Sequence, residues 1–245
     1  MFKRFFLLLF ATTALVATLS SQKNTTDSAF IRDNFTKREV MIPMRDSIRL
    51  FTAIYTPKDQ SQKYPIIIRR TPYSCSPYGE DNFTTSIQNM NLARAGYIFV
   101  FQDVRGKYMS EGEFVDVRPF NPDKKSPKEV DEASDTYDAV EWLLKNVPNN
   151  NGRVGVMGIS YPGFYATMAI PANHPAIKAV SPQAPVTDWF IGDDFHHNGA
   201  FMLMDGFSFY SGFGKPRPKP TTKGSPGFSD WNTPDNYDFF LRAGA

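Results

Sequence analysis

Four short, mainly apolar runs recur between residues 64 and 180, and a helical pattern separates each run from the next. The runs lie at residues 64–68, 97–101, 153–158 and 177–180. Continuous runs of this kind are typical of strands that are buried on both faces of a sheet. Because parallel strands need crossover connections, the alternation predicts an α/β fold with a mostly parallel sheet and helices on both faces.

Three segments between these runs predict helices. Residues 84–95 are polar with scattered apolar positions, and Gly96 follows where a helix would end. In residues 131–145 apolar side chains recur every three to four positions, and acidic residues occupy the first turn. A third helix is predicted over 161–169, with Pro171 breaking it.

An antiparallel hairpin is predicted ahead of this alternation. Residues 40–44 and 48–55 are apolar and flank the polar turn 45–47. Pro57 closes the second strand, because proline cannot donate to a strand ladder.

The first 21 residues are typical of a secretory leader. Lys3 and Arg4 form a basic start, an apolar run extends to Ala17, and a polar tract begins at Ser20. The run is shorter than the roughly 20 apolar residues that a membrane-spanning helix needs. We therefore expect cleavage, export to the periplasm or the medium, and no membrane association afterwards; an uncleaved signal anchor is the alternative.

The charge balance narrows the class of partner. Lys and Arg number 27 and Asp and Glu number 25, and two of the basic residues lie in the leader. A nearly neutral mature chain offers no general attraction to phosphate backbones. We expect a small-molecule partner and no nucleic acid, with homo-oligomerisation left open. Cys75 is the single cysteine, so no intrachain disulfide can form.

The strand and helix alternation stops near residue 186. Residues 189–209 are aromatic-rich without a clear period, and residues 211–229 are rich in glycine and proline. The second composition is typical of a loop or hinge. We interpret residues 35–185 as the N-terminal part of one domain and residues 186–245 as the start of a second, helical unit that is incomplete.

One motif, which begins at the last residue of the run 153–158, indicates a catalytic function. Residues 158–163 read Gly-Ile-Ser-Tyr-Pro-Gly and lie between a predicted strand and a predicted helix. A serine on such a turn presents its hydroxyl above the sheet edge, where the first helical amides can stabilise an oxyanion. Pro162 fits, since first-turn amides have no intrahelical acceptor. The simpler alternative is that Ser160 only caps the helix.

Three further motifs accompany this one in the chain. They are Arg-Thr-Pro-Tyr at 70–73, Gln-Asp-Val-Arg-Gly at 102–106 and Gly-Asp-Asp-Phe-His-His-Asn-Gly-Ala-Phe at 192–201. Together with the serine motif they resemble the α-amino-acid ester hydrolases, which belong with cocaine esterase, the glutaryl cephalosporin acylases and the Xaa-Pro dipeptidyl-peptidases. The resemblance covers about residues 35–210. It implies an incomplete α/β-hydrolase-type sheet followed by the start of a helical cap.

The resemblance also implies roles for five residues. Ser160 matches the nucleophile that forms an acyl-enzyme. The backbone N–H of Tyr161 and the hydroxyl of Tyr73 match the two oxyanion donors. Asp194, next to Asp193, matches an aspartate of the acidic cluster that holds the ammonium group of the substrate. Without the motifs, Tyr73 would be interpreted as a loop aromatic and the aspartates as a capping or solvated pair.

Two other pairs of residues receive no catalytic role. His196 and His197 adjoin the aspartates, but neighbouring histidines on a helix point about 100° apart. We therefore predict no metal site, and no cofactor is expected. Asp103 and Arg105 are interpreted as an internal ion pair or loop anchor.

The general base and its acid partner are expected after the nucleophile, in the order Ser, Asp, His. The histidines beyond Ser160 are His174, His196 and His197, and none follows a late strand. We therefore expect an N-terminal portion of a longer hydrolase, inactive by itself, in which base and acid are absent.

The predicted function is that of a serine hydrolase that cleaves esters or amides of α-amino acids, including β-lactam acyl groups, through an acyl-enzyme on Ser160. A peptidase that releases Xaa-Pro dipeptides is one alternative. A truncated homologue that binds such compounds without turning them over is the other.

Overall fold

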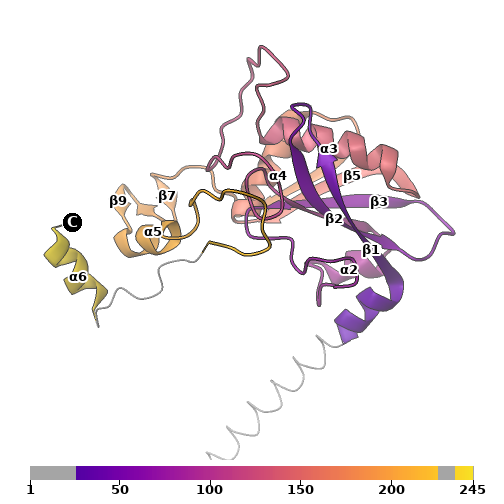
Figure 1. Ribbon diagram of the computed structural model, residues 1–245, viewed down its shortest axis with the longest axis horizontal. Helices are drawn as coiled ribbons and strands as arrows, with labels where there is room; N and C mark the ends of the chain where they lie inside the picture. The colour runs from indigo at the N-terminus through magenta and orange to yellow at the C-terminus, as the bar shows by residue number, and fades with distance from the viewer. Residues whose placement is uncertain (1–25, 226–234, 245) are drawn as a thin grey trace, which may run out of the picture.

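A six-stranded sheet forms the centre of the computed structural model, which describes residues 26–225 and 235–244 (Figure 1). The strand order is β1-β2-β4-β3-β5-β6. The strands are β1 (Phe35–Pro43), β2 (Arg49–Pro57), β3 (Tyr64–Thr71), β4 (Ile98–Asp103), β5 (Asn150–Ile159) and β6 (Ile177–Gln183). The expected leader, residues 1–21, lies outside the described residues.

The strand directions bring two sequence motifs to one edge of the sheet. β1 and β2 form the expected antiparallel hairpin, and β2 is also antiparallel to β4. β4, β3, β5 and β6 are parallel, so the predicted mostly parallel sheet is confirmed. Because β3 and β5 are parallel neighbours, the residues that follow them, including Tyr73 and Ser160, lie at the same edge.

Helices cover both faces of the sheet, as predicted (Figure 1). α3 (Glu132–Asn146) and α4 (Tyr161–Ala172) pack on one face over a buried aliphatic core that includes Ile66 and Leu143. The opposite face carries a helix at residues 26–34 and the short α2 (Met90–Arg94). A second core, with Ile31 and Phe99, lies beneath them. Burial of these apolar side chains from water on both sides stabilises the sheet.

α2 is shorter than the sequence predicts. Of the expected helix 84–95, only Met90–Arg94 is helical, and Asn89 caps it by accepting hydrogen bonds from two backbone N–H groups. The hydroxyl of Thr84 instead donates to the carbonyl of Ser86 at 2.9 Å. Such local side-chain bonds compete with helix formation. Gly96 ends the helix as expected, with φ +82°.

α4 is longer than predicted, and the expected break at Pro171 does not occur. Pro171 lies inside the helix, which continues to Ala172 and ends at Asn173 in the left-handed region. A proline removes one hydrogen bond, to the carbonyl four residues earlier. Since the helix ends one residue later, the cost of that lost bond is confined to its final turn.

The first turn of α3 is buried, and its acidic residues form ion pairs in addition to their favourable interaction with the helix dipole. The Arg70 guanidinium lies 3.0 Å from the Glu132 carboxylate and 3.6 Å from that of Asp135. Arg105 pairs with Asp135 at 2.6 Å and with Asp46 at 2.7 Å. Arg70 also donates to Gln102, at 2.9 Å. This network joins the ends of β3 and β4 to the first turn of α3.

Asp103 and Arg105 do not pair with each other, so that part of their interpretation is wrong. Asp103 anchors the loop after β3 instead: it accepts hydrogen bonds from the backbone N–H of Cys75 at 2.8 Å and the hydroxyl of Tyr78 at 2.9 Å. Burial raises the pKa of Asp103 to about 6, although those two donors act to lower it. The loop-anchor interpretation is therefore confirmed for Asp103.

A smaller group of elements follows β6, on the left of Figure 1. It comprises β7 (Gly192–Asp193), β8 (His196–His197) and β9 (Ala200–Phe201), which form a three-stranded sheet, and the helices α5 (Leu203–Tyr210) and α6 (Asn236–Ala243). Strands of two residues are too short to show alternation, so the sequence pattern missed them. Residues 211–225 contain no helix or strand, as the glycine and proline content predicts.

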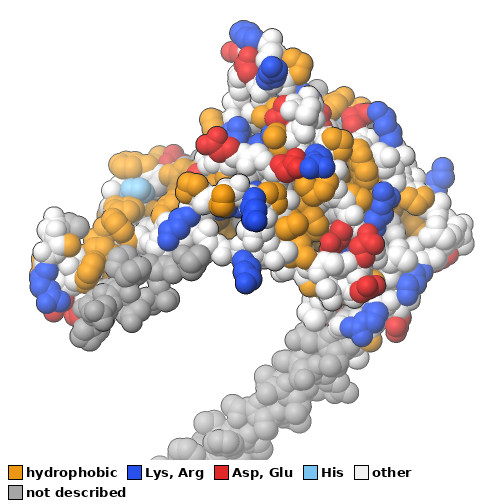
Figure 2. Space-filling view, viewed as in Figure 1, with side chains coloured by type: hydrophobic (Ala, Val, Ile, Leu, Met, Phe, Trp, Pro, Cys, Tyr) orange, Lys and Arg blue, Asp and Glu red, His pale blue; other side chains and the backbone are white. Residues whose placement is uncertain are grey.

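Hydrophobic side chains gather on the surface of this smaller group, as Figure 2 shows. Phe190, Ile191 and Phe201 are among the most exposed. Over the described ranges, no helix has both the length and the apolar character to cross a membrane.

Candidate active site

Ser160 is the single residue between β5 and α4. Its φ of 63° and ψ of −126° fall in a region that costs a residue with a side chain about 1–3 kcal/mol. Its backbone N–H donates to the carbonyl of Gln183 in β6 at 2.9 Å, which holds the turn against the sheet. The side chain is exposed and makes no capping hydrogen bond. The alternative that Ser160 only caps the helix is therefore wrong.

Two glycines allow this turn to be tight. A Cβ on Gly158 would lie 2.1 Å from the carbonyl oxygen of Pro162, and a Cβ on Gly163 would lie 2.6 Å from that of Gln183. Real Cβ atoms do not approach backbone atoms so closely. The motif therefore requires glycine at both positions for a steric reason, as the close packing of strand and helix implies.

The structure brings four of the five predicted site residues to one cavity. Tyr73, Ser160, Tyr161 and Asp194 line a space of about 530 Å³, together with Val186, Trp189, Phe195, Asp205, Ser208 and Phe209. The backbone of Asp193 lies in β7, in register with His196. The side chain of Asp193 is outside the described part of the structure.

Tyr73 follows β3 and faces the tight turn at Ser160, between β5 and α4, which we call the elbow. Its backbone N–H donates to the hydroxyl of Thr71 at 3.0 Å, and its ring packs edge-on against Tyr161, with 6.1 Å between centroids. Burial raises the pKa of Tyr73 to about 12, and the carboxylates of Asp116 and Asp194 add to the effect. The phenol is therefore protonated at neutral pH and can donate a hydrogen bond.

Tyr161 contributes a backbone N–H at the start of α4 and a ring in the wall of the cavity. The first amides of a helix have no intrahelical acceptor. The Tyr161 hydroxyl donates to Asp116 at 2.5 Å and accepts from the backbone N–H of Val117 at 2.7 Å. Burial and the bond to Asp116 raise the pKa of Tyr161 above its usual value.

Asp116 connects the elbow with the smaller group of elements, and the sequence reasoning missed it. The hydroxyl of Tyr210 in α5 donates to the second oxygen of Asp116 at 2.7 Å. Asp116 lies in the irregular segment between β4 and α3, where no periodic pattern marks a functional position. Only its tertiary contacts identify it as the link between Tyr161 and α5.

The histidines of the chain have other surroundings. The Nε2 atom of His174 lies 2.9 Å from Glu141, and its Nδ1 accepts from the backbone N–H of Ala176 at 3.0 Å. His196 and His197 lie in the strand β8, not on a helix, so the geometric argument applied to them was wrong. None of the described residues that line the cavity is a histidine.

The side chains around the cavity include hydroxyl, phenol, carboxylate and aromatic groups, and the described residues contain no metal ligand set. Within residues 26–225 and 235–244, no group of three or more His, Cys, Asp or Glu side chains is placed to hold a metal ion. The cavity instead combines the exposed hydroxyl of Ser160, the neutral phenol of Tyr73 and the carboxylates of Asp194 and Asp205. Such groups can form an acyl-enzyme, stabilise an oxyanion and attract a cation.

The strand order, the tight turn at Ser160 and the position of that turn at the carboxyl edge of the sheet define an α/β-hydrolase fold. The family model described as X-Pro dipeptidyl-peptidase (S15 family) matches residues 46–233, more than half of the chain. The chain belongs to this family.

Individual relatives agree with that assignment. The chain is 32% identical over 167 residues to the cocaine esterase of Rhodococcus sp. (strain MB1 Bresler), an alignment that covers 67% of this chain and 26% of the esterase. A crystal structure of an aminopeptidase from the marine sediment archaeon Thaumarchaeota archaeon superposes with a TM-score of 0.73 at 38% identity. An α-amino acid ester hydrolase labelled with selenomethionine superposes with a TM-score of 0.72 at 41% identity.

The chain spans only part of each relative. Both superpositions cover 86% of this chain and 34% of the matched structure. The chain thus corresponds to about a quarter of the cocaine esterase and a third of the two solved structures.

Proposed function

We propose that the complete protein is a serine hydrolase that cleaves esters or amides of α-amino acids, including β-lactam acyl groups. The observation that carries the proposal is the strained, exposed Ser160, which lines a cavity together with Tyr73, Tyr161 and Asp194. Strain of this kind persists where the surrounding structure imposes it, and it gathers at functional sites.

The acyl transfer proceeds in two steps. The Ser160 hydroxyl attacks the carbonyl carbon, and its proton passes to a general base. The oxyanion accepts hydrogen bonds from the Tyr161 backbone N–H and the Tyr73 hydroxyl. The leaving alcohol or amine takes up the proton as its bond to the acyl carbon breaks. Water then attacks the acyl-enzyme, releases the amino acid and restores the serine.

The general base and its acid partner belong, in this proposal, to parts of the complete protein outside this chain. The hydrogen bonds of His174 to Glu141 and Ala176 support this division, because they occupy both of its ring nitrogens. This chain supplies the nucleophile, the oxyanion donors and part of the acyl pocket. We also propose that residues 186–245 begin a cap over the cavity and that the mature protein is exported.

Asp194 selects amino acyl groups. A carboxylate in the cavity wall attracts the α-ammonium group of the substrate and offers nothing comparable to a plain acyl group. Two similar solved structures, an aminopeptidase and an α-amino acid ester hydrolase, support an aminoacyl substrate. The family model also favours a second candidate, a peptidase that releases Xaa-Pro dipeptides through the same serine.

A fluorophosphonate probe tests the nucleophile in the complete protein. We expect the probe to label the wild type and the Ser208→Ala variant but not Ser160→Ala, since only the activated serine reacts. Ser208 is the matched control because it lines the same cavity. Mass spectrometry of the labelled peptide identifies the site. Equal labelling of Ser160→Ala and the wild type would overturn the proposal.

A further inference from the structure

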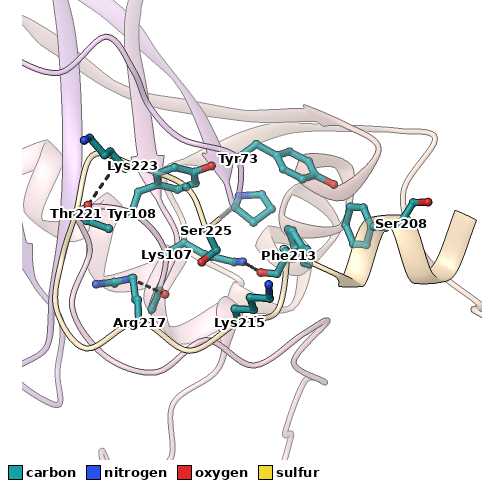
Figure 3. A pocket seen from close by; sticks show the side chains of 15 residues that line it. Tyr73, Lys107, Tyr108, Ser208, Phe213, Lys215, Arg217, Thr221, Lys223 and Ser225 are labelled. Atoms are coloured by element: carbon teal, nitrogen blue, oxygen red, sulfur yellow. Dashed lines mark hydrogen bonds between the residues drawn. The ribbon is translucent and has the colours of Figure 1, made fainter. Parts of the chain in front are cut away.

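A second cavity adjoins the one that contains Ser160. It has a volume of about 360 Å³ and shares Tyr73, Ser208 and Phe209 with the first cavity as part of its wall. Four basic residues line it: Lys107, Lys215, Arg217 and Lys223. None of the described residues in its lining is acidic. Figure 3 shows the basic side chains in this cavity together with Tyr73.

Lys107 is held without a carboxylate partner among the described residues. Its ammonium group donates to the backbone carbonyl of Phe213 (Figure 3). It lies 3.8 Å from the centroid of the Phe213 ring and 4.1 Å from the centroid of the Phe114 ring. Burial lowers the pKa of Lys107 to about 8; Asp116 opposes the shift and Arg217 adds to it. A partly buried cation without a paired anion is costly, and a bound anion would offset that cost.

Arg217 is held in the same way. Its guanidinium donates to the backbone carbonyls of Gly106, at 3.0 Å, and Ser110. Burial lowers its pKa, although the charge of Asp103 opposes the shift. Across the described ranges no ion pair joins Arg217 to a carboxylate. Backbone carbonyls therefore orient both cations. None of these three hydrogen bonds neutralises the positive charge of Lys107 or Arg217.

The two cavities carry opposite charges on either side of a shared wall. Asp194 and Asp205 line the cavity of Ser160, whereas the cations line its neighbour. We propose that the second cavity binds a carboxylate on the leaving group of the substrate. The preferred substrates are then zwitterionic amides, in which an α-aminoacyl group is joined to an amino acid with a free carboxylate. This inference rests on the proposed function, because it assigns the leaving-group side of the same site.

Binding to the complete protein with Ser160→Ala tests the inference without turnover. The probes are phenylalanyl-glycine and phenylalanyl-glycinamide, which differ only in the terminal carboxylate; the aromatic wall with Trp189 and Phe195 suits the phenylalanyl group. Calorimetry should show that the free acid binds about tenfold more tightly, as a charge-assisted hydrogen bond predicts. Equal affinity for the two compounds would overturn the inference.

Two substitutions test whether the preference for the free acid comes from Lys107 and Arg217. Lys107→Met and Arg217→Gln, each added to Ser160→Ala, should reduce the tenfold preference to about twofold or less while binding of the carboxamide is retained, which also shows that the variants fold. Lys128→Met removes an exposed lysine elsewhere and should keep the full preference. A preference that survives both substitutions would overturn the assignment to this cavity.

The outcome is separable from that of the nucleophile test. One outcome is that the free acid binds tenfold more tightly than the carboxamide while the probe fails to label Ser160 in the wild type. That outcome would support the anion site and contradict the proposed hydrolase function. Labelling of Ser160 with equal binding of acid and carboxamide would do the reverse.

Discussion

Ser160 shows how a single residue is forced into its conformation. The turn at this position is closed by close packing at Gly158 and Gly163, where any side chain would collide with a backbone carbonyl. The serine therefore adopts a strained backbone conformation because its neighbours leave no other path from β5 to α4. The hydroxyl is directed out of the turn and not into a helix cap.

A substitution of Tyr73 tests whether this single residue stabilises the oxyanion. Tyr73→Phe removes the hydroxyl and keeps the ring that packs on Tyr161 and Phe213. Loss of one oxyanion donor typically lowers kcat by about 10²–10³-fold. We expect a fall of that size in kcat, with little change in KM, measured on an amino-acid ester with the complete protein.

The control for this variant is Tyr237→Phe, which removes an exposed hydroxyl from α6. It should leave kcat unchanged. If Tyr73→Phe also keeps its full kcat, Tyr73 is only a packing residue in the cavity wall.

The sequence could predict part of this site and not the rest. The motifs that contain Ser160, Tyr73 and Asp194 predicted residues that the structure places around one cavity, and their chemical roles stay predictions. Asp116 and Lys107 could not be predicted, because both lie in the irregular segment between β4 and α3. The position of a side chain in such a segment depends on tertiary contacts, and no periodic sequence pattern indicates it.

At the scale of elements, a network of buried charges joins the ends of β3 and β4 to the first turn of α3. Acidic residues in the first turn of a helix are ordinarily explained by the helix dipole. Here Glu132 and Asp135 are also buried against Arg70 and Arg105. Burial raises the pKa of Glu132, and the charge of Arg70 opposes the shift. A helix pattern could not reveal this network, since its partners come from other elements.

Arg70→Met tests the network. It leaves two carboxylates buried beside an apolar side chain, and breaking a buried ion pair typically costs about 3–5 kcal/mol. We expect the free energy of unfolding, measured by chemical denaturation of the complete protein, to fall by that amount.

Arg49→Met is the matched control, because the ion pair of Arg49 with Glu111 is exposed. Its unfolding free energy should stay close to that of the wild type. Equal effects of the two substitutions would show that the buried network contributes no more than a surface ion pair.

At the scale of the whole molecule, β1 and β6 are the two outer strands of the sheet, and β6 lies beside exposed apolar side chains. β6 pairs with β5 on one side and has no neighbour on the other among the described strands. Its residues Ala179 and Ser181 are exposed, as are the nearby apolar side chains of Ile159 and Ile170, at 46% and 58%. Unpaired strand edges beside apolar surface promote association between copies.

The 245-residue chain, expressed by itself, should therefore self-associate in a concentration-dependent way, measured by light scattering. Ser181→Lys places a charge on the open strand and should reduce the association. Ser126→Lys, in an exposed loop, should have no effect. A chain that stays monomeric at every concentration would show that β6 is protected in solution.

The carboxylate that Tyr161 and Tyr210 share also bears on substrate size. Ser208 and Phe209 of α5 line the cavity of Ser160, and the adjacent Tyr210 shares the carboxylate of Asp116 with Tyr161, the first residue of α4. An acyl group too large for the cavity could displace α5 only by breaking the hydrogen bond between Tyr210 and Asp116. In the proposed hydrolase, Asp116 would therefore limit the size of the acyl group that reaches Ser160 without touching the substrate itself.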